Sequence, residues 1–256
     1  SVAEALSLTS NKPQAIQDAR LKHQCRGILA AADLLSPPYR VLESGGMLTS
    51  KLIGECVFPC VVKPVALSGS RGVIRADNAN ELSAAIVRIR RILERESPSL
   101  DRSILIEGFI EGHEYAIEGV LSSGIFQCLA IFDKPDPLDG PYFEESIYLT
   151  PANIRNSLKT EIVETIASAC GALGLTHGPI HAECRVNRLG VWVLEVAART
   201  IGGQCGRLLE LALGVSLEEV IMSNALGRAA PIADQGQSAG VMMIPVPGAG
   251  VLRRIE

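Results

Sequence analysis

Residues 178–200 constrain the fold more than any other segment of the chain. Their side chains alternate with a period of two over two runs, which is typical of a β-hairpin with one buried face. One alternating set is apolar and belongs against a core: Ala182, Cys184, Val186, Trp192, Leu194, Val196 and Ala198. The other set carries the polar groups: His181, Glu183, Arg185, Val193, Glu195, Ala197 and Arg199. The segment therefore predicts a sheet whose second face holds paired acids.

The number of residues in the turn decides whether these two acids meet. A two- or four-residue turn would place Glu183 and Glu195 on opposite faces of the sheet. A three-residue loop over 188–190 pairs Glu183 with Glu195 and His181 with Ala197. Only this odd-numbered register keeps every apolar residue of the hairpin on one face, so we expect it.

Two carboxylates opposite each other on a sheet stand about 5 Å apart at Cβ and repel each other. A divalent cation would remove that repulsion, and oxygen ligands of this kind suit Mg²⁺ that is also bound to phosphate oxygens. Arg199 lies further along the same face, where a guanidinium could hold a phosphoryl oxygen. A solvated hairpin face with an Arg–Glu ion pair fits the same pattern, and the residues alone leave both interpretations open.

A loop of small residues, VALSGSRG, follows a predicted buried strand over 58–63. Lys63 closes that strand, and a charge at the end of an apolar strand is costly unless it faces a site. Small residues let backbone N–H groups approach phosphate oxygens closely. The loop matches neither the GxxxxGK[ST] nor the GxGxxG motif, and an ordinary hairpin turn explains it equally well when it is taken alone.

The segment ILIEGFIEGHEYAIEGV contains four acids: Glu107, Glu111, Glu114 and Glu118. Acids at strand ends either bind ribose hydroxyls or act as edge charges that discourage aggregation. Elsewhere, periodicity mixes helices and strands without a regular βαβ repeat, so we expect the α+β class. The expected helices cover 13–33, 158–173 and 207–226, and a further helix with an apolar stripe over 82–93 is expected to be capped by Asp77 or Asn78. The expected strands cover 40–42, 73–75, 103–107, 115–121 and 125–132.

Composition excludes several classes of protein. The 24 Lys and Arg residues against 28 Asp and Glu residues give a net charge of −4, which predicts no nucleic-acid partner. No apolar run approaches the roughly 18 residues of a membrane span, so we expect no membrane partner. The 7 cysteines lack a CxxC pair and fit free thiols in a cytoplasmic protein.

In their order along the chain, these segments resemble the ATP-grasp superfamily, and within it the carboxylate–amine (L-amino acid) ligases. The resemblance covers FPCVVKPVALSGSRGV, ILIEGFIEGHEYAIEGV, the hairpin GPIHAECRVN with VWVLEVAARTIGG, and the loop DKPDPLDGPYFEESIYLTP. It implies an ATP-grasp fold with two lobes and a nucleotide bound between antiparallel sheets. The implied parts are a small lobe with an N-terminal helical segment over 1–106, a large lobe with the metal-binding hairpin over 107–235, and the start of a truncated C-terminal portion over 236–256. The chain opens at Ser1, so we expect an excised catalytic core.

The resemblance also implies a role for individual residues. Lys63 and Arg199 would be catalytic, and Glu183 and Glu195 would bind the metal. The implied ATP-binding residues are Lys22, Lys63, Ser68, Gly69, Ser70, Gly72, Glu107, Phe109, Ile110 and Glu114. The implied substrate-binding residues are His181, Gly202 and Gly203. Many relatives have an Asn ligand where this chain has Ala197, which leaves open whether one or two metal ions bind.

The function implied by the resemblance is ATP-dependent formation of an amide bond through an acyl phosphate. The cofactors would be ATP and Mg²⁺, with Mn²⁺ as a substitute, and the partners would be a small-molecule carboxylate and an amine such as amino acids. A homodimer is compatible with this family. Two alternatives stay open: a non-catalytic ATP-binding module, and another ATP-grasp synthetase of the carboxylase or phosphotransferase type.

Overall fold

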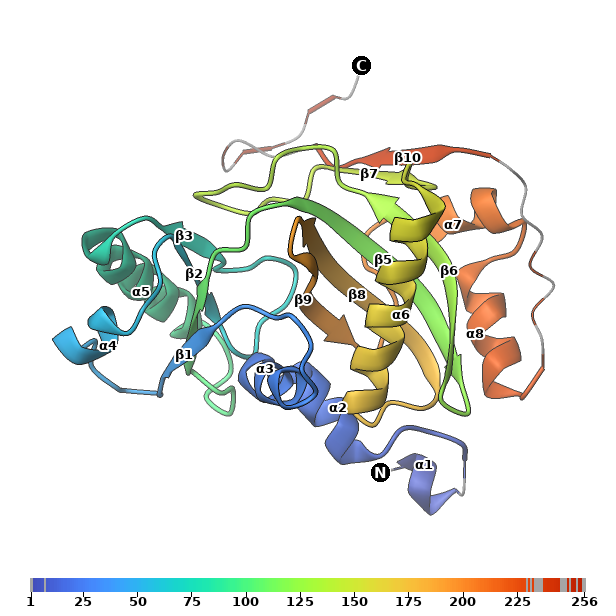
Figure 1. The fold of residues 1–256 in the computed structure, drawn as a ribbon, viewed down its shortest axis with the longest axis horizontal. Helices are drawn as coiled ribbons and strands as arrows, with labels where there is room; N and C mark the ends of the chain where they lie inside the picture. Colours follow the sequence, from blue (N-terminus) through green and yellow to red (C-terminus); the bar gives the residue numbers. More distant parts are fainter. Residues whose placement is uncertain are drawn as a thin grey trace.

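The computed structural model describes residues 2–6, 8–228, 230, 232, 237–244, 248, 250–251 and 253–254. Two antiparallel sheets divide the chain into two lobes (Figure 1). The first sheet has the order β1-β4-β2-β3, with β1 at Tyr39–Leu42, β2 at Cys60–Pro64, β3 at Ile74–Ala76 and β4 at Ile104–Gly108. The second has the order β10-β7-β6-β5-β8-β9, with β5 at His113–Ser122, β6 at Ile125–Asp133, β7 at Ile147–Thr150, β8 at Gly178–Asn187, β9 at Gly190–Ala197 and β10 at Ala239–Met242. The α+β expectation is confirmed.

The small lobe packs one long helix, α5 (Ala79–Leu93), on β2 and β3. The apolar stripe predicted for this helix is buried: Leu82, Ala85, Ile86, Ile89 and Leu93. The helix begins directly after Asn78, one of the two predicted caps, whose side chain accepts hydrogen bonds from the backbone of Asn80 and Glu81. A short helix, α4 (Ser50–Gly54), lies beside this lobe and was not expected from the sequence.

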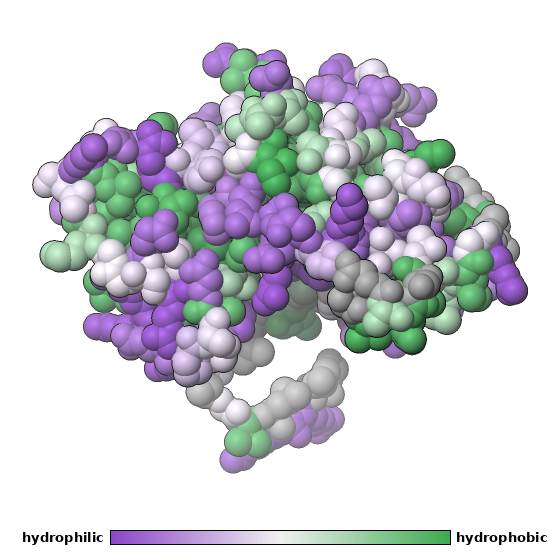
Figure 2. Space-filling model, turned by 90° about the horizontal axis from the view of Figure 1, so that it is seen from below, coloured by the Kyte–Doolittle hydropathy of each residue, from purple (hydrophilic) through white to green (hydrophobic). Residues whose placement is uncertain are grey.

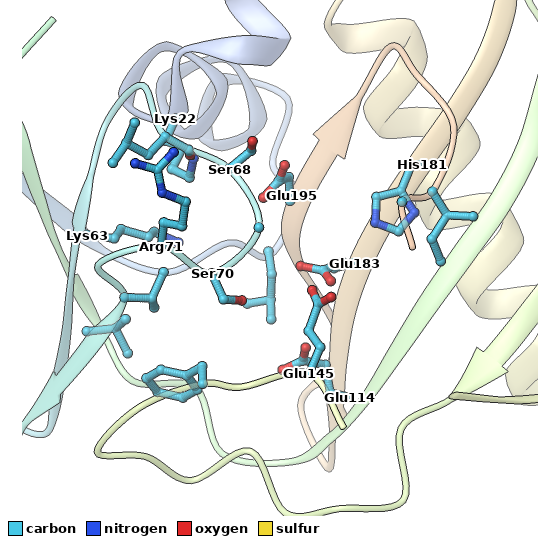
Figure 3. A pocket seen from close by; sticks show the side chains of 18 of the residues that line it. Lys22, Lys63, Ser68, Ser70, Arg71, Glu114, Glu145, His181, Glu183 and Glu195 are labelled. Carbon is cyan, nitrogen blue, oxygen red and sulfur yellow. The ribbon is translucent and has the colours of Figure 1, made fainter. Parts of the chain in front are cut away.

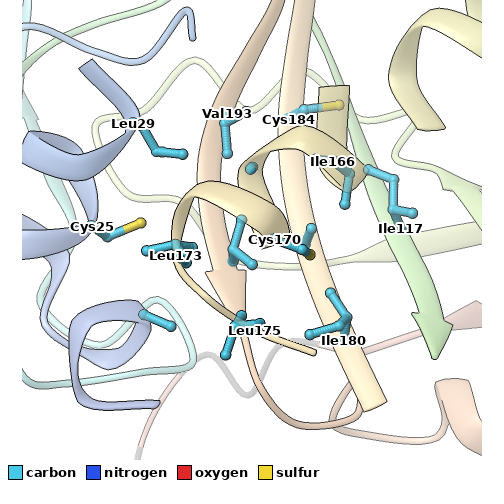
Figure 4. Close-up of a cluster of buried hydrophobic side chains, with 14 of the residues drawn as sticks. Cys25, Leu29, Ile117, Ile166, Cys170, Leu173, Leu175, Ile180, Cys184 and Val193 are labelled. Carbon is cyan, nitrogen blue, oxygen red and sulfur yellow. The ribbon is translucent and has the colours of Figure 1, made fainter. Parts of the chain in front are cut away.

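Helices cover both faces of the large sheet. On one face, α6 (Asn156–Ala172) packs on β6 and β9 and buries the cluster shown in Figure 4. The opposite face of β5 contributes Ala116 and Val120 to a second cluster under α7 (Cys205–Leu213) and α8 (Leu217–Ala225). Tyr115 and Ile117 of the same strand point into the α6 cluster, as the strand's alternation requires.

Two predicted helices are each broken into two. The helix expected over 13–33 forms α2 (Pro13–Arg20) and α3 (Lys22–Ala31), because Leu21 takes an extended backbone with φ −86° and ψ 102°. The break lets α2 pack on β9 while α3 also contacts α6 and β1. The helix expected over 207–226 is interrupted at Gly214, whose left-handed φ of 68° ends α7 before Ser216 caps α8.

The β8–β9 hairpin has the predicted acid pair but a shorter turn. Glu183 lies opposite Glu195, as predicted. Asn187 pairs with Gly190, so two residues form the loop, and the three-residue loop predicted over 188–190 is wrong. With a two-residue loop, the glutamates share a face only if β9 contains one extra residue between the turn and Glu195.

Leu194 is that extra residue. The pairing shifts by one position after Glu183, because Cys184 pairs with Val193 and leaves Leu194 as a β-bulge. The carbonyl oxygen of Leu194 has no partner in the ladder and accepts a hydrogen bond from the Arg26 guanidinium instead. The sequence pattern gave no sign of this bulge, because a regular strand explained the same residues.

The bulge changes which side chains of β9 face the core. Val191 and Val193 are buried in the α6 cluster, although Val193 was expected on the polar face. Trp192 and Leu194 were expected in the core but are half-buried, and Trp192 lies opposite Arg185 on the polar side. The predicted division of the hairpin into an apolar and a polar face is therefore correct for β8 and wrong for the first half of β9.

Other parts of the large lobe were not expected. Strand β10 comes from residues late in the chain and extends the sheet beyond β7 (Figure 1).

All seven cysteines carry free thiols, as predicted. None of the described helices is long and apolar enough to cross a membrane. On the face seen in Figure 2, hydrophilic side chains cover most of the surface and hydrophobic ones show in small patches between them. Residues 236, 245–247, 249, 252 and 255–256 of the expected C-terminal portion lie outside the described residues.

The buried face of α6 should carry much of the stability of the large lobe. Ile166 is 0% exposed within the α6 cluster. Replacing Ile166 with Ala should lower the free energy of unfolding by about 2–5 kcal/mol, because the removed methyl groups leave a cavity. Thr160→Ala on the exposed side of the same helix should change it by less than about 0.5 kcal/mol. Urea unfolding curves measure both, and similar values for the two variants would contradict the packing described here.

Candidate active site

One cavity of about 510 Å³ lies between the two lobes and is lined by both. Figure 3 shows Lys22, Lys63 and the loop around Ser70 on one side of it and the glutamates of the large sheet on the other. The cavity brings together all predicted site residues except one: Lys22, Lys63, Ser68, Gly69, Ser70, Glu107, Phe109, Ile110, Glu114, His181, Glu183, Glu195, Arg199, Gly202 and Gly203. The exception, Gly72, lines a neighbouring cavity of about 620 Å³.

The polar face of the large sheet presents its charges in rows across β5, β8 and β9. The strand pairings give three rows: Glu114–Arg185–Trp192, Ala116–Glu183–Glu195 and Glu118–His181–Ala197. The predicted pairing of His181 with Ala197 is thus confirmed. Because alternate side chains of a strand share a face, β5 and β8 each contribute one residue to every row, at a spacing of two residues.

A buried cluster of charges holds Lys63 at the edge of the cavity. Glu107 is 3% exposed, and its Oε1 lies 2.6 Å from Arg26 Nε while Oε2 pairs with Lys63 Nζ. Burial alone would raise the pKa of Glu107, but Arg26 and Lys63 outweigh it and lower that pKa. The Glu107 side chain is therefore occupied inside the protein and is not available for a contact with adenine.

Lys134 ties together two acids that the sequence assigned to different roles. Its Nζ lies 2.8 Å from Glu114 Oε1 and 2.7 Å from Glu183 Oε1. Arg185 Nε lies 2.9 Å from the other oxygen of Glu114. Burial disfavours the charge on Lys134, but Glu183 and Glu114 overcome it and raise its pKa well above the ordinary value. A buried lysine therefore stays charged between the predicted ribose ligand and a predicted metal ligand.

The glycine-rich loop after β2 crosses the cavity near Lys22. Lys22 Nζ donates a hydrogen bond to the carbonyl of Leu67, which joins α3 to the start of this loop. Burial is the main cause that lowers the pKa of Lys22, and the nearby Lys63 adds to it. Gly69 and Gly72 have φ angles of 64° and 75°, which a residue with a Cβ rarely adopts.

The loop between β6 and β7, over 134–146, spans from the large lobe to the small lobe. The backbone N of Arg75 on β3 lies 2.9 Å from the carbonyl of Pro141, and its Nη1 lies 2.8 Å from that of Asp139. Arg88 of α5 donates to the Tyr142 hydroxyl at 2.8 Å. We call this segment the strap, because it closes one side of the cavity through contacts between the lobes.

A sequence model described as the ATP-grasp domain matches residues 56–207. This match covers more than half of the chain. The chain belongs to the ATP-grasp family. The match includes the glycine-rich loop, Lys134 and both strands of the hairpin that carries Glu183 and Glu195.

Relatives of this ATP-grasp protein include ligases. The L-amino acid ligase from Bacillus licheniformis superposes with a TM-score of 0.80 and 29% identity, covering 98% of this chain and 60% of that one. Dapdiamide A synthase of Enterobacter agglomerans is 26% identical over 83% of this chain and 50% of its own length. A D-alanine–D-alanine ligase of Prochlorococcus marinus is 26% identical over 77% of this chain and 58% of its own. The chain thus spans about half the length of the curated relatives it matches.

Sequence reasoning missed three charged residues of this ATP-grasp site: Arg26, Lys134 and Glu145. It named Glu118 and Arg185 as polar strand positions but not the partners that they contact here. Lys134 directly follows an apolar strand, the same signal that marked Lys63, so it could have been found. Arg26 lies between buried helix residues and gave no comparable signal, because its partners come from two other elements. Burial and the nearby Glu183 raise the pKa of Glu145, which lines the cavity from the strap.

The Arg26–Glu107 pair should matter far more for stability than an exposed pair of the same types. Arg26→Ala leaves Glu107 and the Leu194 carbonyl buried without their partner, which costs about 3–5 kcal/mol of unfolding free energy. Arg40 and Glu55 form a comparable pair at 3.0 Å whose side chains are 46% and 39% exposed. Arg40→Ala should cost less than about 1 kcal/mol. Equal losses in urea unfolding would show that the buried pair is not a structural anchor.

The acid pairs should make stability fall with decreasing pH. Burial would raise the pKa of Glu183, but Lys134 outweighs it and lowers that pKa below its ordinary value of 4.5. Since the folded state then binds fewer protons than the unfolded state, this contribution is present above pH 4.5 and is lost as the pH falls below it. In Lys134→Met, stability measured by urea unfolding should fall less steeply as the pH drops below 4.5, because the cation that lowers the Glu183 pKa is gone. Lys51→Met, at an exposed lysine, should keep the wild-type profile, and a wild-type profile in Lys134→Met would refute the assignment.

Proposed function

We propose that this protein is an ATP-dependent carboxylate–amine ligase that joins amino acids through an acyl phosphate. The observation that carries the proposal is the acid pair Glu183–Glu195, which faces Lys63 and the glycine-rich loop across one cavity. The similarity of the chain to an L-amino acid ligase and to dapdiamide A synthase supports a carboxylate and an amine as the substrates.

The residues at the acid pair fit a magnesium ion. Glu183 and Glu195 lie directly opposite each other and both line the cavity. The described residues contain no cluster of three or more His, Cys, Asp or Glu that could hold a metal without other ligands. Mg²⁺ is usually bound by one or two carboxylates, with phosphate oxygens and waters as the remaining ligands, so two are sufficient. When bound, it would neutralise phosphate charge, and Mn²⁺ could substitute for it.

Each end of the cavity has its own task. At the small-lobe end, Lys63 and Lys22 would bind the nucleotide phosphates, and the backbone N–H groups of the glycine-rich loop would surround them. Phe109 and Ile110 would receive the adenine. At the other end, Arg199 would hold the phosphoryl group in transfer, since its guanidinium is 46% exposed and lies 3.7 Å from Glu195.

The reaction would follow in two displacements. A carboxylate oxygen of the first substrate attacks the γ-phosphorus of ATP, the bond to the β-phosphate oxygen breaks, and ADP leaves. The nitrogen of the neutral amine of the second substrate then attacks the acyl carbon, and the bond from that carbon to the phosphate oxygen breaks. Phosphate leaves with the electron pair and takes up the one proton that the amine nitrogen loses, and the other proton stays on the amide nitrogen. Lys63 and Arg199 would stabilise the negative charge that builds up in both steps.

Glu195→Gln tests this proposal, because it keeps the shape of the side chain and removes its charge. The variant should release phosphate at least about 100-fold more slowly than the wild type when a mixture of amino acids and MgATP is supplied. Glu210→Gln, at an exposed position of α7, is the matched control and should keep the wild-type rate.

The substrates required for phosphate release separate the alternatives. Release that needs both a carboxylate and an amine supports the ligase. Release with one acceptor alone would favour another ATP-grasp synthetase, of the carboxylase or phosphotransferase type. A thermal shift with MgATP but no release from any mixture would favour a non-catalytic ATP-binding module.

A further inference from the structure

A buried carboxylate that the proposed mechanism does not use lies under the substrate end of the cavity. Glu118 is 0% exposed and sits on β5 directly opposite His181 of β8. Its Oε2 lies 3.2 Å from His181 Nδ1. Both of its oxygens lie 3.1 Å from the backbone N of Ile201. One side chain thus contacts a ring and a loop that both line the cavity.

The loop that Glu118 contacts carries the groups proposed to meet the substrate. It runs over 198–204, from the end of β9 to the start of α7, and forms no helix or strand. Arg199, Gly202 and Gly203 of this loop line the cavity, and Ile201 lies in their midst. A segment without a hydrogen-bonding ladder needs side-chain anchors to hold one conformation. The Glu118 carboxylate supplies such an anchor from beneath.

The surroundings of Glu118 explain how a carboxylate can be buried there. A buried charge is costly unless it is paired and hydrogen-bonded. Within the described part of the chain, His181 is the one basic side chain within 4 Å of Glu118, and its Nδ1 forms a hydrogen bond with that carboxylate. The Ile201 N–H supplies the remaining hydrogen bonds. The carboxylate is therefore satisfied only while both the ring and the loop keep their places.

The bond to Glu118 also fixes the tautomer of His181. A carboxylate accepts hydrogen bonds, so Nδ1 of the neutral imidazole carries the proton and donates it. Nε2 then carries the lone pair. A ligand that meets this nitrogen has to bring a donor, such as the N–H of an amine or ammonium group.

We propose that Glu118 is the positioning residue of the substrate end of the cavity. It holds the Ile201 N–H, so that the backbone at Gly202 and Gly203 faces a carboxylate or acyl phosphate. It also keeps the His181 proton on Nδ1. The geometry does not depend on the proposed function, whereas the identity of the ligand as an amino acid rests on it. A purely structural role, as support for the bulge between Glu118 and Gly119 in β5, is the competing explanation.

Hydrogen exchange at the Ile201 amide measures the anchoring directly, without any substrate. Glu118→Ala removes the acceptor, so exchange at this amide should become at least about tenfold faster. Glu118→Gln keeps one acceptor oxygen, so it should keep most of the protection. Asn224→Ala is the matched control, because Asn224 joins α8 to the same strand through Leu121 and Ser122 but lies outside the loop. It should leave the exchange of Ile201 unchanged.

The tautomer of His181 provides a second readout, which stays measurable if Glu118→Ala does not fold. The chain has only 4 histidines, so long-range ¹H–¹⁵N spectra at pH 8 can resolve their rings. His181 should carry its proton on Nδ1 in the wild type and on Nε2 in Glu118→Gln, since the Gln amide group can donate to Nδ1. Asn224→Ala should show the wild-type tautomer.

Kinetics connect this geometry to the reaction. The kinetic test uses conditions under which the wild type releases phosphate. There, Glu118→Ala and Glu118→Gln should raise the KM for the carboxylate or the amine about tenfold and change the affinity for MgATP less than twofold. Unchanged exchange at Ile201 in Glu118→Ala, an unchanged His181 tautomer in Glu118→Gln, or equal effects in Asn224→Ala would each overturn the inference. A wild type that shows the predicted exchange and tautomer but releases no phosphate would overturn the proposed function instead.

Discussion

The buried guanidinium of Arg26 is the interaction on which the rest of this structure depends. It extends from α3 and contacts an acid of the small sheet, Glu107, and a carbonyl of the large sheet, Leu194. The Leu194 carbonyl at the bulge and the buried Glu107 carboxylate each need a hydrogen-bond donor, and the planar Arg26 guanidinium donates to both. Because the bulge at Leu194 is what turns Glu195 toward Glu183, the same contact links the arrangement of the lobes to the geometry of the site.

The charges of the cavity differ in how firmly the protein holds them. Glu107 and Glu114 are buried in short ion pairs, so they shape the walls and orient the lysines. Glu195 and Arg199 are 28% and 46% exposed and stand 3.7 Å apart, a contact that contributes little to stability. These two groups are therefore free to exchange their mutual contact for a ligand, while the buried pairs keep the surrounding frame fixed.

The sequence predicted the site better than it predicted the path of the chain. Alternation in 178–200 was enough to pair Glu183 with Glu195, because a polar pair and a buried face constrain each other. The same alternation hid the bulge at Leu194, since a short turn plus one extra residue gives the same pairing as a longer turn. The predicted acid pair was therefore correct, although the predicted turn and the predicted core face of β9 were wrong.

Long-range partners explain what the sequence could not show. Arg26, Lys134 and Glu118 become site residues through partners that lie 20 to 168 positions away along the chain. A lone charge within an apolar helix or strand gives no sign of which distant group satisfies it. The breaks at Leu21 and Gly214 have a similar origin, because each lets consecutive helices pack against different neighbours.

The strap makes the enclosure of the cavity asymmetric. On one side the lobes are continuous through the peptide chain at 108–113, and on the other the strap meets the small lobe through Arg75, Arg88 and the bridge between Ile74 and Tyr142. The side-chain contacts of Arg75 and Arg88 are exposed, so parting them costs far less than breaking the buried cluster around Arg26. Opening along this weaker seam would let a nucleotide reach the proposed site without disturbing the buried cluster around Arg26. Repeated exchange of ligands then leaves the interior of the protein unchanged.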